Sequence, residues 1–476
     1  MSDTLVQNYV NGKLVDSAAT EFTELVDPAT GKVTGRSPKS TPDEVDQAVR
    51  AAEAAFAGWR RTTPSRRQQV LLKLADAIEE HSDELVELQS RNTGQIKALI
   101  ASEEVKVGAD QLRFFAGAAR NLEGKATGEY MDGLSSWVRR EPIGVVAQVT
   151  PWNYPLMMAL WKIGPAIAAG NTVVLKPSDT TPESTVKLAE IAGGILPPGV
   201  FNVINGDGQT GKTLVEHPVP GLVSITGSIR AGISVAVSAA QQLKRAHLEL
   251  GGKAPVVVFA DADIKAAADG IAMAGYFNAG QDCTAATRVI VAEKIHDQFV
   301  EALVAKAKET RPGDRDDEDA AYGPLNNANH FAKVCAIMAK LPDHATVATG
   351  GKQFGTEGFF FEPTVITGLQ QEDQAIQEEI FGPVITVQPF QDEADALAKA
   401  NGVPYGLSSS VWTKDHATAL RMSRDLDFGC VWINTHIPLT AEMPHGGFGQ
   451  SGYGKDLSGY GFEDYTRVKH VMSSLE

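Results

Sequence analysis

Residues 143–176 read IGVVAQVTPWNYPLMMALWKIGPAIAAGNTVVLK, and the pattern of this stretch indicates the fold class. It begins with an apolar run at 145–149, continues through a helical segment at 155–168, and returns to a β-branched run at 172–175. Further strand-like runs at 201–204 and 222–226 alternate in the same way with helical segments at 182–193 and 229–242. This alternation predicts an α/β fold in which helices cover both faces of a parallel sheet. Such sheets bind ligands beyond the carboxyl ends of their strands.

The rest of the chain extends this pattern in both directions. A second alternating series begins with the run 255–259 and continues to about residue 440. We therefore predict a second α/β domain, with a boundary near residue 250. Upstream, the Asn11-Gly12 pair predicts a hairpin turn, and the motif TPDE at 41–44 predicts a helix that starts with a capping box.

Composition narrows the class of protein. The chain has 476 residues, of which 43% are apolar and 21% charged, as in a soluble globular protein with more than one domain. Its net charge of −16 and the lack of a long basic run argue against nucleic acid or an anionic membrane as partner. The first residues have no basic and apolar leader, and no apolar stretch reaches about 18 residues, so neither a secretory signal nor a membrane span is expected.

Cysteine and histidine usage points to a reducing compartment and to no metal. The sparse cysteines, Cys283, Cys335 and Cys430, suit the cytoplasm better than a disulfide framework. The ten histidines form no H-E-x-x-H motif, and no cysteines are paired at metal-ligand spacing. We therefore expect a cytoplasmic protein without a metal site.

A glycine-rich segment offers one functional hypothesis. Residues 206–213 read GDGQTGKT and fit two phosphate-binding patterns, G-x-G-x-x-G and G-x-x-x-x-G-K-T. In a nucleotide triphosphatase, Lys212 and the Thr213 hydroxyl would hold phosphates and Asp261 could bind Mg²⁺. The chain contains 45 glycines, so chance matches are expected, and an ordinary strand-to-helix turn is the alternative. The acidic residue that a dinucleotide site requires about 20 positions downstream is missing.

A set of motifs points elsewhere. They are TPWNYPL at 150–156, KPSDTTP at 176–182, LELGGKAP at 248–255, FNAGQDCTAATR at 277–288, EEIFGPV at 378–384 and GCVWINTH at 429–436. In this order and spacing, they resemble the aldehyde dehydrogenase superfamily along essentially the whole chain. The resemblance implies NAD-dependent oxidation of an aldehyde to a carboxylic acid.

Three residues match the family's catalytic positions. Cys283 matches the nucleophile, whose thiolate adds to an aldehyde to give a thiohemiacetal and, after hydride loss, a thioester. Asn153 matches the amide that stabilises the oxyanion together with the backbone N–H of Cys283. Glu249 matches the general base that activates water for thioester hydrolysis. The adjacent Gly251-Gly252 predicts a close backbone approach.

The same resemblance places the NAD site. Lys176 and Asp179 match positions that hold the adenosine ribose. Because the family usually has Glu at the second position, Asp179 is a departure, but its carboxylate would still favour NAD over NADP. The remaining cofactor positions are Gly227 and Ser228 after Thr226 at the pyrophosphate, Glu379 and Phe381 at the nicotinamide end, and Thr150 and Trp152 in the motif around Asn153.

The substrate is less sharply indicated. The positions that line the family's aldehyde tunnel are occupied by Tyr154, Trp161, Asp282, Thr284 and His445. The motifs are most similar to those of bacterial γ-aminobutyraldehyde dehydrogenases, which implies an aminoaldehyde such as 4-aminobutanal. Asp110 and Glu442 are candidates to receive its ammonium group, although each could equally be a solvent-facing acid. Betaine aldehyde and plain aliphatic or aromatic aldehydes remain alternatives.

The resemblance also implies a domain organisation. A Rossmann-like NAD-binding domain would comprise 1–123 and 142–250, and an α/β catalytic domain would span 251–445. A small β oligomerisation arm would be built from 124–141 and from the return segment 446–476. Such an arm extends a partner's sheet, so a homodimer or homotetramer is expected.

Overall fold

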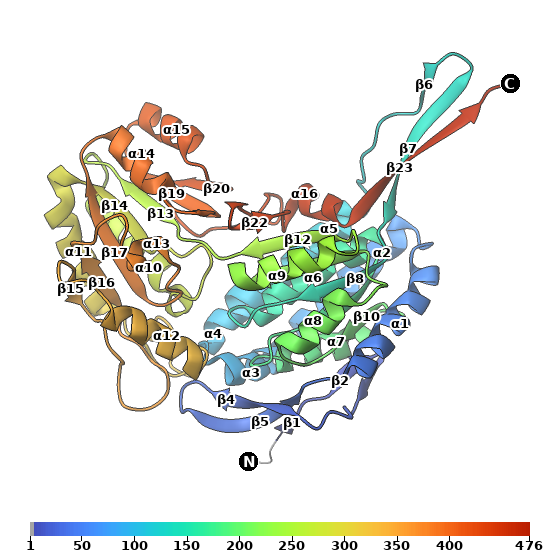
Figure 1. Cartoon of the computed structure of the whole chain (residues 1–476), viewed down its shortest axis with the longest axis horizontal. Coiled ribbons are helices and arrows are strands. Elements are labelled where there is room, and N and C mark those ends of the chain that lie inside the picture. The colour runs from blue at the N-terminus through green and yellow to red at the C-terminus, as the bar shows by residue number, and fades with distance from the viewer. Residues whose placement is uncertain (1–3) are drawn as a thin grey trace.

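Two sheets lie side by side in the computed structural model, which describes residues 4–476 (Figure 1). The first has eight strands in the order β22-β12-β11-β8-β9-β10-β2-β3. Its central strands, from β12 to β10, are parallel. The strands are β2 (Asn8–Val10), β3 (Lys13–Val15), β8 (Val145–Val149), β9 (Thr172–Lys176), β10 (Phe201–Val203), β11 (Leu222–Gly227), β12 (Arg245–Leu250) and β22 (Gly452–Tyr453).

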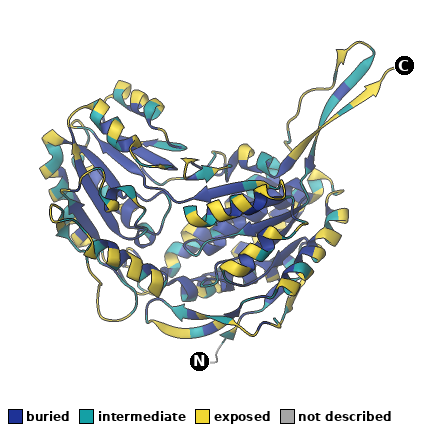
Figure 2. Ribbon diagram, viewed as in Figure 1, coloured by how far each residue is buried: buried dark blue, intermediate teal, exposed yellow. Residues whose placement is uncertain are grey.

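Helices cover both faces of this sheet because successive strand residues point to opposite sides. Val173 packs into one apolar core, and its neighbour Val174 packs into another. The first core is built with α2 (Pro64–Glu80), α3 (Ser82–Thr93), α5 (Val107–Ala118), α6 (Pro155–Ala169) and α7 (Glu183–Gly193). The second is built with α1 (Pro42–Trp59), α8 (Gly208–Glu216) and α9 (Ile229–Ala240). The strands are therefore buried while the outer helix faces are exposed (Figure 2).

The local predictions in this region are confirmed. Strands and helices fall within two residues of the predicted runs. Asn11 and Gly12 both have positive φ, 53° and 84°, as the hairpin between β2 and β3 requires. At the start of α1, the Thr41 hydroxyl accepts from the backbone N–H of Glu44, and the Glu44 carboxylate accepts from the N–H of Thr41, which completes the capping box.

The second sheet has seven strands in the order β15-β16-β17-β14-β13-β19-β20, and only β15 is antiparallel to its neighbour. The strands are β13 (Pro255–Val258), β14 (Arg288–Ala292), β15 (Thr346–Thr349), β16 (Thr364–Thr367), β17 (Val384–Phe390), β19 (Ser408–Trp412) and β20 (Cys430–Ile433). One face carries α10 (Ile264–Tyr276), α11 (His296–Glu309) and α12 (Ala328–Ala339). The other carries α14 (Glu393–Asn401) and α15 (His416–Asp425).

Short elements complete the chain. They are β1 (Thr4–Leu5), β4 (Phe22–Asp27), β5 (Lys32–Pro38), α4 (Lys97–Leu99), the π-helix η1 (Ile100–Lys106), the 3₁₀ helices η2 (Phe277–Gly280) and η3 (Glu293–Ile295), α13 (Gln374–Gln377), β18 (Tyr405–Gly406), β21 (Phe448–Gly449) and α16 (Ser458–Asp464). No helix in the described part of the chain has the length and apolar character needed to cross a membrane.

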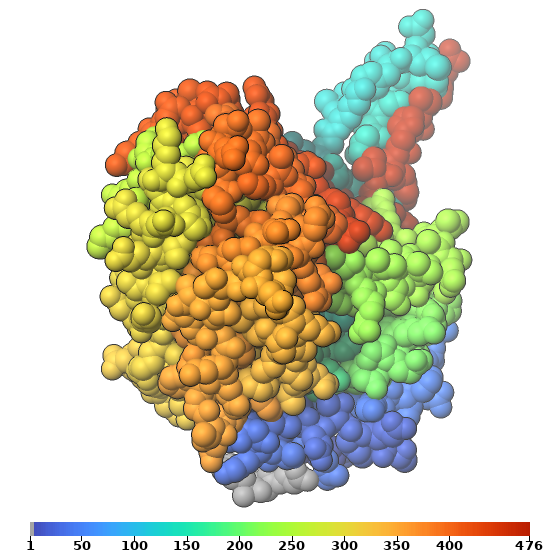
Figure 3. Space-filling view, turned by 60° about the vertical axis from the view of Figure 1, so that its left-hand side comes forward, coloured from blue at the N-terminus to red at the C-terminus, as the bar shows by residue number. Residues whose placement is uncertain are grey.

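A three-stranded arm projects from the body of the molecule. It consists of β6 (Gly128–Met131), β7 (Leu134–Pro142) and β23 (Thr466–Ser474), in the order β23-β7-β6. The space-filling view shows that it stands clear of the rest of the chain (Figure 3). Large apolar side chains on it, among them Tyr130, Met131 and Val468, are exposed.

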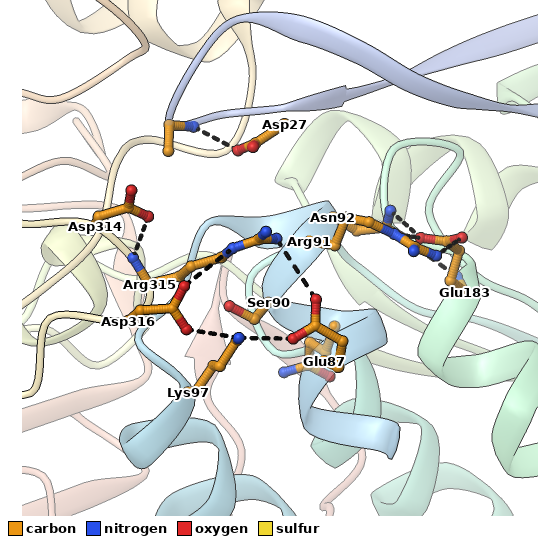
Figure 4. Close-up of polar contacts among 12 residues, drawn as sticks. Asp27, Glu87, Ser90, Arg91, Asn92, Lys97, Glu183, Asp314, Arg315 and Asp316 are labelled. Carbon is orange, nitrogen blue, oxygen red and sulfur yellow. Dashed lines mark hydrogen bonds and ion pairs between the residues drawn. The ribbon is translucent and has the colours of Figure 1, made fainter. Parts of the chain in front are cut away.

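An ion-pair cluster connects the loop between α11 and α12 to the first half of the chain (Figure 4). Lys97 Nζ lies 2.7 Å from a carboxylate oxygen of Glu87 and 2.6 Å from one of Asp316. The backbone N–H of Lys97 donates to the carbonyl of Arg315. These side chains are partly exposed, so each pair contributes about 1 kcal/mol or less. The cluster fixes where this loop meets α3 and α4.

Candidate active site

The order of the first sheet indicates where a ligand binds. From β8 the chain proceeds through β9 and β10 on one side, and it then returns to place β11 and β12 on the other side. Parallel sheets bind ligands at such a switch point, in the crevice beyond the carboxyl ends of the strands. Here that edge carries Trp152 and Asn153 after β8, Gly227 at the end of β11 with Ser228 after it, and Gly251 after β12.

A cavity opens at this edge and reaches the second sheet. It encloses about 1040 Å³ of space, part of it open to solvent. Its apolar and aromatic wall includes Trp152, Met157, Met158, Trp161, Phe381, Ile437 and Leu439. Its polar groups include Asn153, Tyr154, Ser228, Glu249, Asp282, Cys283, Thr284, His330, Lys333, Glu379, His445 and Asp456. An apolar cavity with a few convergent polar groups is the usual form of a small-molecule site.

The loop that presents Cys283 has an unusual backbone. Asn278, Ala279 and Gly280 have φ values of 49°, 57° and 68°, three consecutive residues in the left-handed region. For the two residues that are not glycine this conformation costs on the order of 1–3 kcal/mol each, and it persists only where neighbouring groups hold it. The Asn278 amide does so by donating to the carbonyls of Asn153 and Gln281, at 3.0 and 3.3 Å. Strain of this kind clusters at functional sites.

Asn153 is fixed to this loop through its side chain. Its Nδ2 donates to the carbonyl of Gln281 at 3.0 Å, and the residue is only 7% exposed. An amide nitrogen carries two hydrogens, so one remains for a group in the cavity that Asn153 and Cys283 both line. This arrangement can stabilise negative charge on an oxygen bonded to a carbon that Cys283 attacks.

Glu249 is buried without hydrogen-bond partners. It is 3% exposed, and within residues 4–476 neither carboxylate oxygen has a partner. Burial raises the pKa of Glu249 well above its usual value, and the nearby Asp456 raises it further. Burial likewise raises the pKa of the Cys283 thiol, with a further contribution from the carboxylate of Asp282. A carboxyl group with a raised pKa suits a general base for water.

Two glycines allow this close packing. A Cβ at Gly252 would overlap the carbonyl oxygen of Cys283, and a Cβ at Gly251 would overlap the carboxylate of Glu379. The predicted close backbone approach at Gly251-Gly252 is thus confirmed. The backbone N–H of Gly252 also donates to Glu379 Oε1 at 2.9 Å, which brings the two sheets together at the cavity.

The predicted pyrophosphate positions lie where a helix begins. Ser228 is the N-cap of α9 and accepts from the N–H of Ala231, so the helix N-terminus faces the edge where Gly227 ends β11. The hydroxyls of Thr150 and Thr226, at the ends of β8 and β11, are buried and have no partner among the described residues. Unpartnered donors beside a helix N-terminus fit an anionic ligand that crosses this edge.

At the predicted nicotinamide position, two side chains of α12 bond to the backbone of the segment that precedes β17. His330 Nε2 donates to the carbonyl of Phe381 at 2.6 Å, and Lys333 donates to the carbonyl of Glu379 at 3.0 Å. Phe381 is in the left-handed region with φ 62°, and its ring contacts that of Trp152 edge to face. Burial lowers the pKa of His330 to about 4, so the neutral ring donates this bond.

The predicted ribose residues lie outside the cavity lining of the described chain. Lys176 is buried, and its Nζ donates to the carbonyls of Pro177 and Gly206 at 2.6 and 2.8 Å. Burial lowers the pKa of Lys176 to about 8. Asp179 is half-buried beside the Ser178 hydroxyl. Two of the three hydrogens of the Lys176 ammonium group are used by these carbonyls, so one remains for a ribose hydroxyl.

The predicted substrate residues fall into two groups. Tyr154, Trp161, Asp282, Thr284 and His445 all line the cavity. Asp282 accepts from the Tyr154 hydroxyl at 2.8 Å and from the Thr284 hydroxyl at 2.7 Å. His445 packs on Trp161, and within residues 4–476 its Nδ1 has no partner.

Asp110 and Glu442, the two residues predicted to receive an ammonium group, do not line the cavity. Both are exposed, and neither is among the described residues that line the cavity. Asp110 lies in the first turn of α5, a helix that buries its other face in the core, so its carboxylate remains in solvent. Besides Glu249 and Glu379, the carboxylates that line the cavity are those of Asp282 and Asp456.

The sequence did not indicate a buried charge network around Asp456. Lys162 Nζ and His247 Nε2 lie 3.3 and 3.2 Å from its carboxylate oxygens, and all three residues are at most 1% exposed. Burial alone would raise the pKa of Asp456, but these two cations outweigh it and lower the pKa. The only signal in the sequence was a lysine inside an otherwise apolar helix, and its partner lies 294 positions away.

The triphosphatase hypothesis is wrong. Helix α8 begins at Gly208, so most of the supposed loop is already helical. Asp207 caps this helix by accepting from the N–H groups of Gln209 and Thr210, and Lys212 points to solvent beside Glu216. Asp261 is occupied by the Thr413 hydroxyl and two backbone N–H groups. No group of metal-binding residues was found among residues 4–476.

Comparisons with known proteins agree with this geometry. The model of the aldehyde dehydrogenase family matches residues 14–471. An aldehyde dehydrogenase from Emericella nidulans is 40% identical over 98% of this chain and 95% of that protein. A phenylacetaldehyde dehydrogenase from Pseudomonas fluorescens is 39% identical over the same shares. The crystal structure of a betaine aldehyde dehydrogenase from Staphylococcus aureus in complex with NAD⁺ superposes with a TM-score of 0.96 at 36% identity, covering 98% of this chain and 95% of that one.

Proposed function

The chain belongs to the aldehyde dehydrogenase family, and we propose that it oxidises an aminoaldehyde such as 4-aminobutanal through a thioester on Cys283. It is an NAD-dependent aldehyde dehydrogenase. The observation that carries the proposed mechanism is the meeting of Cys283, Asn153 and Glu249 in one cavity, at the junction of the two sheets.

The first step joins Cys283 to the aldehyde. The thiol gives its proton to solvent water, and its sulfur adds to the carbonyl carbon, so the carbonyl oxygen becomes an oxyanion. The free hydrogen of Asn153 Nδ2 and the backbone N–H of Cys283 donate to that oxygen. Collapse of the oxyanion expels the hydrogen on carbon as a hydride and leaves a thioester.

The cofactor supplies the acceptor for that hydride when it is bound. The fit of NAD rests on the buried unpartnered hydroxyls of Thr150 and Thr226 beside the start of α9, and on Glu379, whose Oε2 is not used by Gly252. We propose that Trp152, Gly227, Ser228, Glu379 and Phe381 hold it from the cavity side, and that Lys176 and Asp179 hold the adenosine ribose. A carboxylate at Asp179 favours a ribose hydroxyl over a phosphate.

Hydrolysis then releases the acid. Glu249 takes a proton from water and the resulting hydroxide attacks the thioester carbon. The thiolate of Cys283 then leaves and takes up the proton held by Glu249, which regenerates the base. The unpartnered carboxylate of Glu249 is free to accept that proton because nothing in the described chain bonds to it.

The substrate proposal rests on Asp282. Its carboxylate lines the cavity directly before Cys283 in the chain, in a wall that is otherwise mostly apolar and aromatic. An ammonium group gains more from a carboxylate and aromatic faces in such surroundings than it would in water. We therefore propose Asp282, with Tyr154 and Trp161, as the recognition site for the amino end, and Thr284 and His445 as neighbouring contacts.

Betaine aldehyde and a plain aliphatic or aromatic aldehyde are the competing substrates. The names of the Staphylococcus aureus and Pseudomonas fluorescens relatives point to these classes. The same cavity could accept a quaternary ammonium by its aromatic faces alone, without Asp282.

The test compares NADH formation with 4-aminobutanal, betaine aldehyde, phenylacetaldehyde and butanal in the wild type and in Asp282→Asn. We expect the highest kcat/KM with 4-aminobutanal, and a loss of about tenfold or more for that substrate alone in Asp282→Asn. Exposed Asp110→Asn is the matched control and should change nothing. Equal kcat/KM for butanal and 4-aminobutanal in the wild type would discard the aminoaldehyde while leaving the mechanism in place.

We also propose that the protein is cytoplasmic and assembles as a homodimer or homotetramer through its arm. Support comes from the edge strand β23 and the exposed apolar side chains on β23 and β6. In this proposal, residues 1–123 and 142–250 form the NAD-binding domain, 251–445 the catalytic domain, and 124–141 with 446–476 the arm and return segment. Light scattering of the purified chain tests the assembly, because a monomer mass would contradict it.

A further inference from the structure

A buried polar cluster formed by Gln89, Gln95 and Glu104 packs against the start of α6. These side chains are 0%, 9% and 1% exposed. Gln89 comes from α3, Gln95 from the turn after it, and Glu104 from the π-helix η1. Buried polar groups of this size are retained only when their hydrogen bonds are satisfied.

The cluster bonds to the backbone around Asn153. Gln95 Nε2 donates to the carbonyl of Asn153 at 3.0 Å and to Glu104 Oε1 at 3.2 Å. Gln89 Nε2 donates to Glu104 Oε1 at 2.5 Å and to Gln95 Oε1 at 3.0 Å. Each amide therefore has its orientation fixed by the carboxylate, which accepts from both.

Two further bonds reach the first turn of α6. The N–H of Leu156 donates to Gln89 Oε1 at 3.1 Å, and the N–H of Met157 donates to Glu104 Oε2 at 3.2 Å. A carboxylate at a helix N-terminus is favoured by the helix dipole and satisfies an otherwise orphaned N–H. The cluster thus holds α6 at the end that begins just after Asn153.

We propose that Glu104 is a positioning residue that, through Gln95, sets the Asn153 amide where the oxyanion forms. This inference rests on the proposed role of Asn153. Glu104 does not touch the main cavity, so it acts only through the backbone at 153–157. A shift of a fraction of an ångström in a donor is enough to weaken oxyanion stabilisation.

The local structure around Glu104 supports its proposed role as a positioning residue. Glu104 lies in a seven-residue π-helix, and π-turns within helices occur frequently at functional sites. Its neighbour Glu103 is exposed, which shows that the π-turn directs one of two adjacent carboxylates inward. Burial raises the pKa of Glu104 to about 7 although its N–H donors oppose this, so above neutral pH those donors face a carboxylate.

The test uses Glu104→Gln, with Glu103→Gln as the matched control in the same turn. Two reactions form an oxyanion at Cys283: aldehyde oxidation and the hydrolysis of p-nitrophenyl acetate without NAD. We expect Glu104→Gln to lower kcat about tenfold in both, since Asn153→Ala itself should cost about 100-fold. The KM for NAD and the rate of thiol alkylation by iodoacetamide, which forms no oxyanion, should stay within about twofold. Glu103→Gln should match the wild type.

A double-mutant cycle separates positioning from a general structural role. If Glu104 acts through Asn153, Glu104→Gln should add less than about twofold to the loss already caused by Asn153→Ala. An equal fold-loss in both backgrounds would overturn the inference, as would a parallel fall in the alkylation rate. Gln95→Leu, which removes the connecting amide, should reproduce the effect of Glu104→Gln and guards against one poorly folding variant. If Asn153→Ala alone left both reactions intact, the proposed role of Asn153 would fail instead.

Discussion

Two glycine-containing segments, 206–213 and 277–284, invite a comparison because each could be read as a catalytic loop. In the first, the backbone N–H groups are already used: α8 begins at Gly208, and Asp207 accepts from the two N–H groups at its start. In the second, side-chain amides hold three residues in the left-handed region, and the chain then presents Cys283 to the cavity.

A sequence motif can therefore form a binding or catalytic site only when its polar groups remain available to a ligand. In the segment 206–213, the Asp207 cap and the helix itself use the backbone N–H groups of Gln209, Thr210 and Gly211, so these groups are not available to a ligand. A strained loop is held by groups outside it, which leaves its functional side chain free. Substitutions in and around the two segments test whether only the second has a catalytic role.

The largest effect is expected from Cys283→Ala. Without the sulfur no thiohemiacetal forms, so aldehyde oxidation should fall on the order of 10⁴-fold or more. NAD binding, measured by the quenching of tryptophan fluorescence, should persist because the proposed cofactor residues are unchanged. Cys335→Ala is the control and should retain full activity. Appreciable turnover by Cys283→Ala would remove the 277–284 segment from its proposed role.

Next in size is Glu249→Gln, which tests what Cys283 becomes during turnover. The amide cannot take a proton from water, so hydrolysis should slow by about 10²- to 10⁴-fold while acylation continues. Intact-protein mass spectrometry should then detect the acyl group on Cys283 after one equivalent of NADH has formed. A steady-state rate equal to that of the wild type would contradict the assignment of Glu249 as base.

The pH dependence of the alkylation rate of Cys283 should follow from the raised pKa of its thiol. A raised pKa means that the thiol is protonated near neutral pH, and the reactive thiolate fraction rises about tenfold per pH unit below the pKa. Alkylation by iodoacetamide should therefore keep accelerating from about pH 7 to beyond about pH 9, the usual range of a free thiol. A plateau below that range would mean that the environment of Cys283 favours the thiolate.

A smaller effect is expected from the backbone of the second segment. Asn278→Val loses the amide bond to Asn153 and places a β-branched residue at φ 49°. We expect about 1–3 kcal/mol of lost stability and about tenfold lower kcat. Asn278→Gly, which tolerates the conformation, should recover the stability but not the kcat. Recovery of both by glycine would show that the amide bond is unimportant.

The smallest effect on activity is expected from a substitution in the first segment, 206–213. Lys212 is exposed and bonds to nothing but Glu216 at 3.9 Å among the described residues, so Lys212→Ala should leave kcat and the KM for NAD within about twofold. A loss of nucleotide binding in this variant would restore the segment 206–213 as a functional site.

Much of the fold was predictable from local patterns. The capping box at Thr41, the turn at Asn11-Gly12 and the strand–helix alternation from 143 to 250 each depend on residues a few positions apart, and all are found. The motif residues Asn153, Glu249 and Cys283 could likewise be named because each lies in a recognisable stretch. The structure brings these three to one cavity.

The acidic side chains that line the cavity could be assigned only in part. Asp282 could be named because it lies in the motif of Cys283. Asp110 and Glu442 were predicted beside it but are exposed and do not line the cavity, whereas Asp456 lines it although no motif pointed to it. The cluster around Glu104 could not be predicted either, since only the packing of η1 buries Glu104 and leaves its neighbour Glu103 exposed.

The α/β architecture, the family and the residues proposed for the reaction could all be inferred from the sequence, because they follow from short-range periodicity and contiguous motifs. The tertiary structure decided which charged groups are buried and with whom. Lys162 and Asp456 meet across 294 positions, and such pairs form only when separate elements remove both partners from water. No local pattern records that meeting, because its free energy arises from the desolvation that packing imposes.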